Sequence, residues 1–397
     1  MGGCSSKNAP HAQDAPGHPE AKIQAGRRRL SVSQASPVPQ KDGTVIGGKP
    51  GGGEADEVRG TIGRAGLTDE DDLATMLPKA NRRCSVFGAP AQEMQRGYDN
   101  KRMEVQGEMN AKTLVEMGVG YACKKGLKPE SPNQDDFFIL TVEDWSLFGV
   151  FDGHGPSGHD VSNFVHKNLP KLIVSDPNFE TEPLTAIKQA FRKVHDMLQV
   201  AANSNDGFDC ALSGTTATVV LHRKNKLFVG HVGDSRAVLA AKAQGGKRLT
   251  AMNLTQDHKP TREDEKKRIQ QHGGEVRRLD GDIPHRVFVK GKMYPGLAMS
   301  RAIGDVVGSS VGVVPDPDVK ELTLEEGRDQ FFLLCSDGVW EFISSQEAVD
   351  IISKQGRKQV QEATEHLTYE AWRRWVAEEE NVVDDITAIV RWITPPA

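Results

Sequence analysis

The sequence predicts an α+β fold, in which antiparallel β-sheets carry α-helices on their outer faces. Apolar runs of strand length occur in adjacent groups, and few helical patterns lie between them. Regular alternation of strands and helices would indicate a parallel sheet, whereas grouped strands favour antiparallel pairing. The 397 residues are enough for one large domain or two ordinary ones.

Six apolar runs predict the buried strands of these sheets. They lie at residues 137–142, 146–151, 217–221, 226–232, 331–334 and 386–393. Four helices are predicted between or after these strands, at residues 161–172, 187–198, 263–271 and 348–352. The third of them is expected to end near Gly273, a typical C-cap. Ser344 and Glu347 have the spacing of a capping box and open the fourth.

The first part of the chain differs in composition from the remainder. Residues 1–114 are rich in Gly, Pro, Ala, Gln and charged residues and contain few aromatic residues. Such a segment cannot bury enough apolar surface to offset its conformational entropy. We therefore expect residues 1–114 to be mostly disordered, with one short helix near 69–76. Residues 115–397 are expected to form the folded domain.

Composition and charge exclude several classes of protein. The formal net charge is -5, with acidic and basic residues mixed along the chain, so no nucleic acid is expected as a partner. The five cysteines are scattered, which argues against a zinc site or a disulfide framework and fits reduced thiols in the cytoplasm. No apolar run is long enough to cross a bilayer, and the N-terminus lacks the apolar core of a secretory signal.

Three aspartates occupy the same kind of position, where a buried strand meets a loop. Asp152 and Asp337 each follow a predicted strand, and Asp384 lies just before another. Carboxylates that converge at one end of a sheet would repel one another, and hard divalent cations would remove that repulsion. Any one of these residues alone is explained equally well as a turn former. The three together, with His154 near Asp152 as a proton donor, indicate a metal site.

Eight short blocks of polar and glycine residues are spread over the predicted domain. One reads Phe-Gly-Val-Phe-Asp-Gly-His-Gly at residues 148–155, and the others lie at 132–135, 213–217, 232–237, 255–260, 296–305, 336–341 and 384–387. Together they resemble the signature blocks of the metal-dependent protein phosphatases, also called type 2C protein phosphatases. Because all the blocks occur in the family's order, the resemblance is specific, and it covers residues 115–393.

The resemblance implies a four-layer αββα fold, a central sandwich of two antiparallel β-sheets flanked by helices on both faces. It also implies two Mg²⁺ or Mn²⁺ ions at one end of the sandwich, with a weaker third. The implied ligands of the two ions are Asp152 as the bridge, the carbonyl of Gly153, the carboxylates of Asp337 and Asp384, and Asp135 through bound water. Asp257 and Glu341 match positions that help to bind the third ion.

The activity implied by the resemblance is the hydrolysis of phosphoserine and phosphothreonine in phosphorylated proteins. A metal-activated water would attack phosphorus without a phosphoenzyme intermediate, and His154 would protonate the leaving oxygen as the general acid. Many members bind phosphate through an arginine. Lys128 is the best counterpart here, although lysine lacks the bidentate fork of arginine. Block 213–217 and Asp234-Ser235-Arg236 are interpreted as strand turns and core support.

Two other functions are also compatible with the sequence. The protein is expected to be a monomer. One is a pseudophosphatase that binds phosphoproteins as a scaffold, against which the retained Asp152, His154, Asp337 and Asp384 weigh. The other is a metal-dependent hydrolase of small phosphate esters. Substrate choice depends on the surface around the metals, which the sequence alone does not show.

The N-terminal segment carries three short modification motifs. Gly2 and Ser6 fit the N-myristoylation pattern, and Cys4 is expected to be palmitoylated. Because one acyl chain binds only marginally, the second would make the anchor stable. The protein is therefore expected at the cytoplasmic face of a membrane, and otherwise in the cytoplasm; the alternative is an unmodified terminus. Ser31 and Ser85 each follow paired arginines and are predicted phosphorylation sites, although such short motifs also arise by coincidence.

Overall fold

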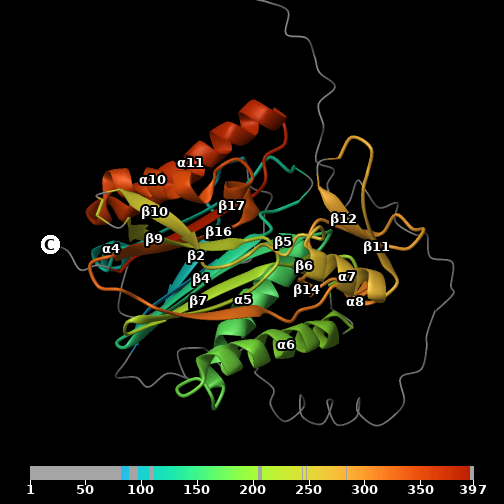
Figure 1. Ribbon diagram of the computed structural model, residues 1–397, viewed down its shortest axis with the longest axis horizontal. Coiled ribbons are helices and arrows are strands. Elements are labelled where there is room, and N and C mark those ends of the chain that lie inside the picture. The colour runs from blue at the N-terminus through green and yellow to red at the C-terminus, as the bar shows by residue number, and fades with distance from the viewer. Residues whose placement is uncertain are drawn as a thin grey trace, which may run out of the picture.

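The computed structural model consists of two large antiparallel β-sheets packed face to face, with helices on both outer faces (Figure 1). It describes residues 82–88, 97–106, 111–129, 131–203, 208–243, 245–246, 248–282 and 284–393. This arrangement confirms the predicted four-layer αββα architecture.

The larger sheet contains nine strands. Seven of them run in the order β15-β8-β7-β5-β4-β1-β2, while β6 pairs with both β5 and β14. Their bounds are β1 Arg82–Gly88, β2 Met103–Gln106, β4 Asp135–Val142, β5 Trp145–His154, β6 Gly214–Thr215, β7 Ala217–Arg223, β8 Lys226–Val232, β14 Ile303–Gly304 and β15 Asp318–Thr323. The central strands β4 and β7 are buried along most of their length, as expected for strands covered on both faces.

The second sheet has five strands in the order β10-β9-β16-β17-β3. The strands are β3 Val119–Lys124, β9 Arg236–Lys242, β10 Leu249–Asn253, β16 Asp329–Cys335 and β17 Ile386–Trp392. Apolar side chains from both sheets meet in a shared core between them. Phe148 of β5 and Phe332 of β16 are fully buried there, with ring centroids 5.4 Å apart in an edge-to-face arrangement.

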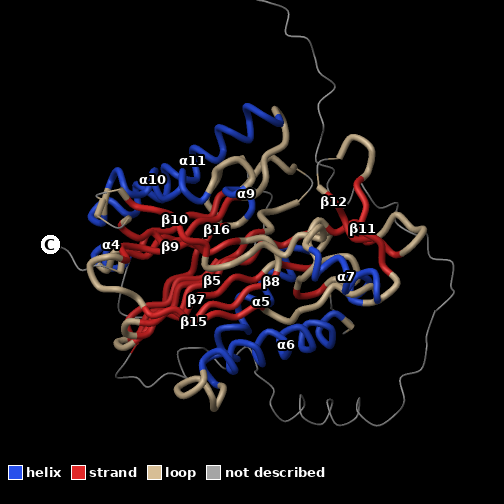
Figure 2. Tube along the Cα trace, viewed as in Figure 1, coloured by secondary structure: helices blue, strands red, loops and turns tan. Residues whose placement is uncertain are grey.

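Two pairs of helices cover the outer faces (Figure 2). α5 (Gly158–Ser175) and α6 (Pro183–Ala202) pack their apolar residues against the nine-stranded sheet. α10 (Ser345–Gln355) and α11 (Val360–Glu379) cover the five-stranded sheet in the same way. The shorter helices are α4 Ala111–Glu116, α7 Glu263–Gln271, α8 Val306–Ser309, α9 Asp337–Trp340 and the 3₁₀ turn η2 Arg357–Gln359.

A small three-stranded sheet lies at one end of the sandwich, on the right of Figure 1. It is formed by β11 Gly274–Arg278, β12 His285–Val289 and β13 Pro295–Leu297. Its own apolar cluster joins Ile269 of α7 to Val287 and Leu297. The apolar pattern of the sequence predicted α7 but none of these three strands, because they are short and carry few apolar residues.

The six strands and the four helices predicted within residues 115–397 are all present, with bounds that differ by a few residues. The short helix expected near 69–76 lies outside the described residues. α7 has the predicted bounds, and Gly273 follows its end with a φ of 79°. Ser344 and Glu347 form the predicted capping box, with reciprocal hydrogen bonds.

Two strands lie N-terminal to the predicted domain start at residue 115. β1 pairs with β4 on one side and with β2 on the other, so backbone hydrogen bonds tie this part of the chain to the sheet. Neither strand was predicted, since β1 contains only a short apolar stretch.

Ser85, a predicted phosphorylation site, lies within β1 opposite Leu140 of β4. The division of the chain at residue 115 stays a prediction.

Candidate active site

The first pair of carboxylates is brought together by strand register. Asp152 near the end of β5 lies directly opposite Asp135, the first residue of β4. The backbone N–H of Asp152 donates a hydrogen bond of 3.0 Å to Thr216 Oγ1, which fixes the strand end. A Cβ atom on Gly153 would lie 2.3 Å from the carbonyl oxygen of Gly158, so only glycine fits beside Asp152.

The second pair comes from the other sheet. Asp337 begins α9 directly after β16, and Asp384 lies two residues before β17, the strand that pairs with β16. Trp375 of α11 donates a hydrogen bond of 2.8 Å from Nε1 to the carbonyl of Gly338 and so holds α9 in place. Ser336 Oγ donates a hydrogen bond of 2.8 Å to Asp135 Oδ2 and thereby connects the two sheets.

Two of these four carboxylates, Asp152 and Asp135, have a raised pKa. Burial and the nearby charge of Asp337, followed by those of Asp135 and Asp384, hold the pKa of Asp152 well above its usual range. Burial likewise raises the pKa of Asp135, with Asp385 as the strongest charged neighbour. Asp135 Oδ1 is buried and accepts no hydrogen bond from the residues that the structure describes. A cluster of repelling oxygen ligands with a buried acceptor left over fits a hard divalent cation such as Mg²⁺ or Mn²⁺.

Asp384 and Asp385 have different surroundings. Asp385 is buried and accepts hydrogen bonds from the backbone N–H groups of Gly126 (2.7 Å) and Gln134 (2.8 Å), so it supports two loops. Asp384 forms an ion pair with Lys128. Burial would lower the pKa of Lys128, but the Asp384 carboxylate more than offsets it and the pKa is raised. The structure thus places Lys128, the predicted phosphate ligand, at the carboxylate cluster.

His154, the predicted general acid, has a partner that the sequence did not reveal. Its Nε2 atom lies 2.7 Å from Oδ2 of Asp305, which is fully buried. Burial alone would lower the pKa of His154, but the Asp305 carboxylate reverses this effect and the pKa is raised. Asp305 therefore favours the protonated, proton-donating form of the ring.

The backbone around Asp305 fixes its side chain against His154. Asp305 has left-handed dihedral angles, φ 49° and ψ 52°, and its N–H donates to the carbonyl of Ser213 at 2.9 Å. A Cβ atom on Gly214 would lie 2.1 Å from Asp305 Oδ2 and 2.8 Å from His154 Nε2. Glycine at 214 therefore makes room for the contact between Asp305 and His154.

The predicted third-metal residues have different positions. Glu341 lies one turn after Asp337, with its N–H bonded to the Asp337 carbonyl at 2.9 Å. Both carboxylate oxygens of Asp257 accept hydrogen bonds from the guanidinium of Arg236, at 3.0 and 2.8 Å. Asp234, interpreted from sequence as part of a turn, is buried and is one of the charges that raise the pKa of Asp152. It therefore adds a fifth carboxylate to the cluster.

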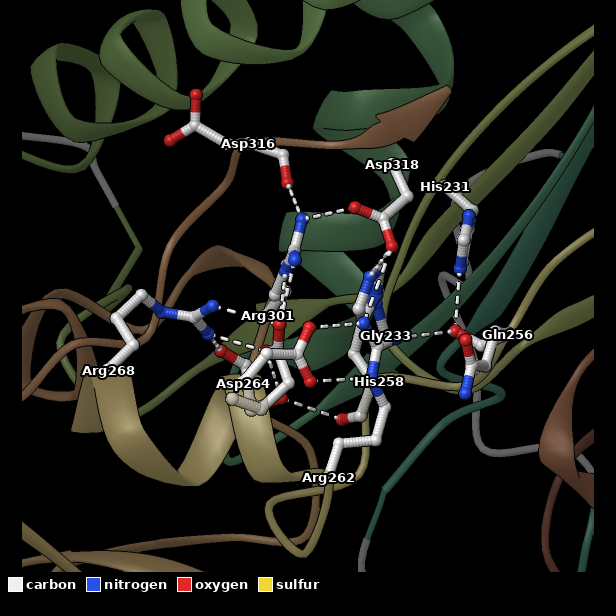
Figure 3. Close-up of polar contacts among 12 residues, drawn as sticks. His231, Gly233, Gln256, His258, Arg262, Asp264, Arg268, Arg301, Asp316 and Asp318 are labelled. Carbon is white, nitrogen blue, oxygen red and sulfur yellow. Dashed lines mark hydrogen bonds and ion pairs between the residues drawn. The ribbon is translucent and has the colours of Figure 1, made fainter. Parts of the chain in front are cut away.

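A second group of metal-type ligands, shown in Figure 3, is formed by His231, His258 and Asp318. The two imidazole rings are stacked, with centroids 4.4 Å apart and planes at 15°. His258 Nδ1 accepts a hydrogen bond from Gly233, and Nε2 lies 3.1 Å from Asp318 Oδ2. Arg301 Nη1 also donates to Asp318 Oδ1 at 2.8 Å.

This histidine group is better explained as structural support than as a metal site. The lone pairs of two stacked rings run parallel and do not converge on one ion. The guanidinium of Arg301 supplies the positive charge that Asp318 needs, and a metal ion beside it would be repelled. Burial and His258 lower the pKa of His231 to about 3, so its ring is neutral at ordinary pH. The acidic cluster is therefore the site to which the metal prediction applies.

The remaining predicted residues concern the N-terminal segment. Gly2, Cys4 and Ser31 lie outside the described residues. Among the helices that the structure describes, none is both long and apolar enough to span a membrane.

Comparisons with known proteins identify relatives of this chain. The sequence model of the family "Protein phosphatase 2C" matches residues 127–379. Probable protein phosphatase 2C 35 of Arabidopsis thaliana is 35% identical over 293 residues, which cover 67% of this chain and 81% of that protein. Probable protein phosphatase 2C 64 of Oryza sativa subsp. japonica is 37% identical over 252 residues, covering 61% and 58% of the two chains.

Two solved structures share the fold at low sequence identity. The serine-threonine phosphatase 2C from Toxoplasma gondii superposes with a TM-score of 0.58 at 21% identity, covering 69% of this chain and 94% of that chain. A sex determining protein of C. elegans gives a TM-score of 0.57 at 20% identity, covering 70% and 65%. The family match and the curated relatives define an enzyme of the protein serine/threonine phosphatase class. The chain belongs to the protein phosphatase 2C family, as its signature blocks predicted.

Proposed function

We propose that this chain hydrolyses phosphoserine and phosphothreonine in proteins and that it depends on Mg²⁺ or Mn²⁺. The observation that carries the proposal is the convergence of Asp135, Asp152, Asp337 and Asp384, whose charges repel one another in a buried setting. Two bound divalent cations would supply an activated water and neutralise the phosphate charge. This chemistry suits phosphate monoesters, which are otherwise very inert.

Each residue of the site has a role in this proposal. Asp152, the Gly153 carbonyl, Asp337 and Asp384 would hold the cations, with Asp135 acting through bound water. Asp257 and Glu341 would help to hold a weaker third ion, and Asp234 is a further carboxylate beside Asp152.

The protein groups that act on the phosphate ester are His154 and Lys128. His154 Nε2 faces Asp305, so Nδ1 is the atom that would carry a proton to the leaving serine or threonine oxygen. Lys128 would leave its ion pair with Asp384 once cations compensate that carboxylate, and would then contact a phosphate oxygen. No side chain is needed as a covalent nucleophile.

Removal of metal tests the proposal. Purified protein treated with a chelator should lose hydrolysis of phosphoserine and phosphothreonine peptides, and added Mn²⁺ or Mg²⁺ should restore it. The melting temperature should also rise on addition of Mn²⁺, since a ligand that binds only the folded state stabilises it. Hydrolysis that persists in chelator would contradict metal dependence. Binding of phosphopeptides without turnover would favour the scaffold function, and hydrolysis of sugar phosphates alone would favour small phosphate esters.

We further propose that the protein is attached to the cytoplasmic face of a membrane by a myristoyl group on Gly2 and a palmitoyl group on Cys4. Gly2→Ala should release the protein into the soluble fraction, because both acyl chains depend on the first modification. Cys4→Ser should give partial release, since a myristoyl chain alone binds membranes marginally. Cell fractionation measures both outcomes, and an unchanged distribution of Gly2→Ala would refute lipid anchoring.

A further inference from the structure

A groove of about 980 Å³ lies next to the acidic cluster. Five of its lining residues are cationic, namely Lys188, Arg236, Lys259, Arg262 and Lys320. Only two lining residues are acidic, Asp257 and Asp318. Several of its lining residues are labelled in Figure 3. They include Arg262 and two residues of the stacked-histidine group, His231 and Asp318.

One cation connects this groove to the catalytic carboxylates. Lys259, which lines the groove, forms an ion pair with Asp234. Because Asp234 in turn acts on Asp152, the inner end of the groove lies at the rim of the acidic cluster.

The cations at the inner end of the groove are compensated within the protein. Arg236 is paired with Asp257, and Arg262 is paired with Asp264. Together with the pair between Lys259 and Asp234, these contacts leave little net charge at the inner end. This part of the groove is therefore expected to accept a neutral backbone or polar side chains.

The two lysines at the outer end differ from these three cations. Lys188 on α6 and Lys320 on β15 are exposed, and neither side chain has a hydrogen-bond or ion-pair partner within the described part of the chain. They face the same groove from two different layers of the fold, a helix and a sheet. The outer end therefore carries uncompensated positive charge.

We propose that this groove binds acidic side chains of the phosphoprotein substrate, which lie several residues away from the phosphorylated serine or threonine. Lys188 and Lys320 are the charge partners of those acidic residues. The inference rests on the proposed phosphatase function, because the groove begins where the phosphorylated residue would be held. An extended chain advances about 3.3 Å per residue, so a substrate can place its phosphate at the cluster and its acidic residues in the groove.

The test uses two phosphopeptides and a charge-reversal variant of the full-length protein. The peptides share one phosphoserine core, and one carries aspartates on both flanks where the other carries serines. The variant combines Lys188→Glu and Lys320→Glu. The control combines Lys167→Glu and Lys193→Glu, two exposed helix lysines outside the groove, and so makes the same change in net charge.

The variant should raise the KM for the acidic peptide about fivefold at low ionic strength, with kcat unchanged. The serine-flanked peptide should show no such change, and the effect on the acidic peptide should shrink at 0.5 M salt as screening increases. The control variant should behave as the wild type with both peptides.

Two outcomes would overturn the inference. One is an equal change in KM for both peptides, and the other is an equal effect of the control variant. Hydrolysis of an aryl phosphate with Mn²⁺, measured in all three proteins, separates this result from the parent proposal. If the wild type hydrolyses neither peptide nor the aryl phosphate, the phosphatase function itself fails.

Discussion

Asp152→Asn is expected to lower the kcat for phosphopeptide hydrolysis on the order of 10³-fold, equivalent to about 4 kcal/mol of transition-state stabilisation. Asp152 lies opposite Asp135 in the sheet and is close enough to Asp337 and Asp384 for their charges to raise its pKa. An amide is nearly the same size as a carboxylate but carries no charge. The substitution therefore removes the central charge of the proposed metal site without removing volume from the core.

The fold should tolerate this substitution. Asp152 is one of several repelling carboxylates, so the metal-free variant should melt at the same temperature as the wild type or higher. Asp337→Asn should give a comparable loss of activity for the same reason. Asp144→Asn, in the exposed turn between β4 and β5, is a matched control and should keep full activity. Wild-type activity in both site variants would refute the proposed site.

Asp305→Asn is expected to lower kcat for phosphoserine peptides about 10²-fold with little change in KM. The carboxylate contacts His154 Nε2 at 2.7 Å and favours the protonated ring that the proton transfer requires. Asparagine is the suitable replacement, because it accepts the left-handed backbone conformation of residue 305 better than most residues do.

The dependence on the leaving group distinguishes this role from a general loss of structure. An aryl phosphate releases a stable phenolate and needs no proton donor, so Asp305→Asn should hydrolyse it at a nearly normal rate. His154→Gln should show the same selectivity, and the double variant should be no worse than His154→Gln alone. Equal losses on serine and aryl substrates would show that Asp305 does not act through His154.

The acidic residues at strand ends show how much of the site could be predicted from the sequence. Asp152, Asp337 and Asp384 were predicted because each lies where a buried strand meets a loop, and the structure brings them to one end of the sandwich. Asp234 follows β8 in the same way, yet its Asp-Ser-Arg context was interpreted as a turn. The same signal, applied to every strand end, would have found it.

Asp305 illustrates what the sequence could not show. It lies 151 residues from His154, and no apolar run precedes it to mark it as a strand-end acid. Only the folded chain, with Gly214 leaving room between them, reveals the contact. The groove could not be predicted from the sequence either. Lys188 and Lys320 belong to different layers of the fold, and neither lies in a recognisable sequence motif.

The fold was predicted most accurately where apolar residues are large and closely spaced. β4, β5 and β16 contain several Phe, Ile or Leu residues, whereas β9 contains three alanines and was missed. Alanine has a high intrinsic propensity for helices. This segment forms a strand because it lies between β10 and β16 in the sheet. β1 was missed for a related reason, since its pairing with β4 is a long-range contact.

The central claim is that the buried carboxylate cluster holds divalent cations, and calorimetric titration with Mn²⁺ tests it most directly. Metal-free wild-type protein should bind Mn²⁺ with at least two ions per chain, and Asp152→Asn should lose most of that binding while remaining folded. Absence of Mn²⁺ binding by the wild type, or identical binding by Asp152→Asn, would contradict the account.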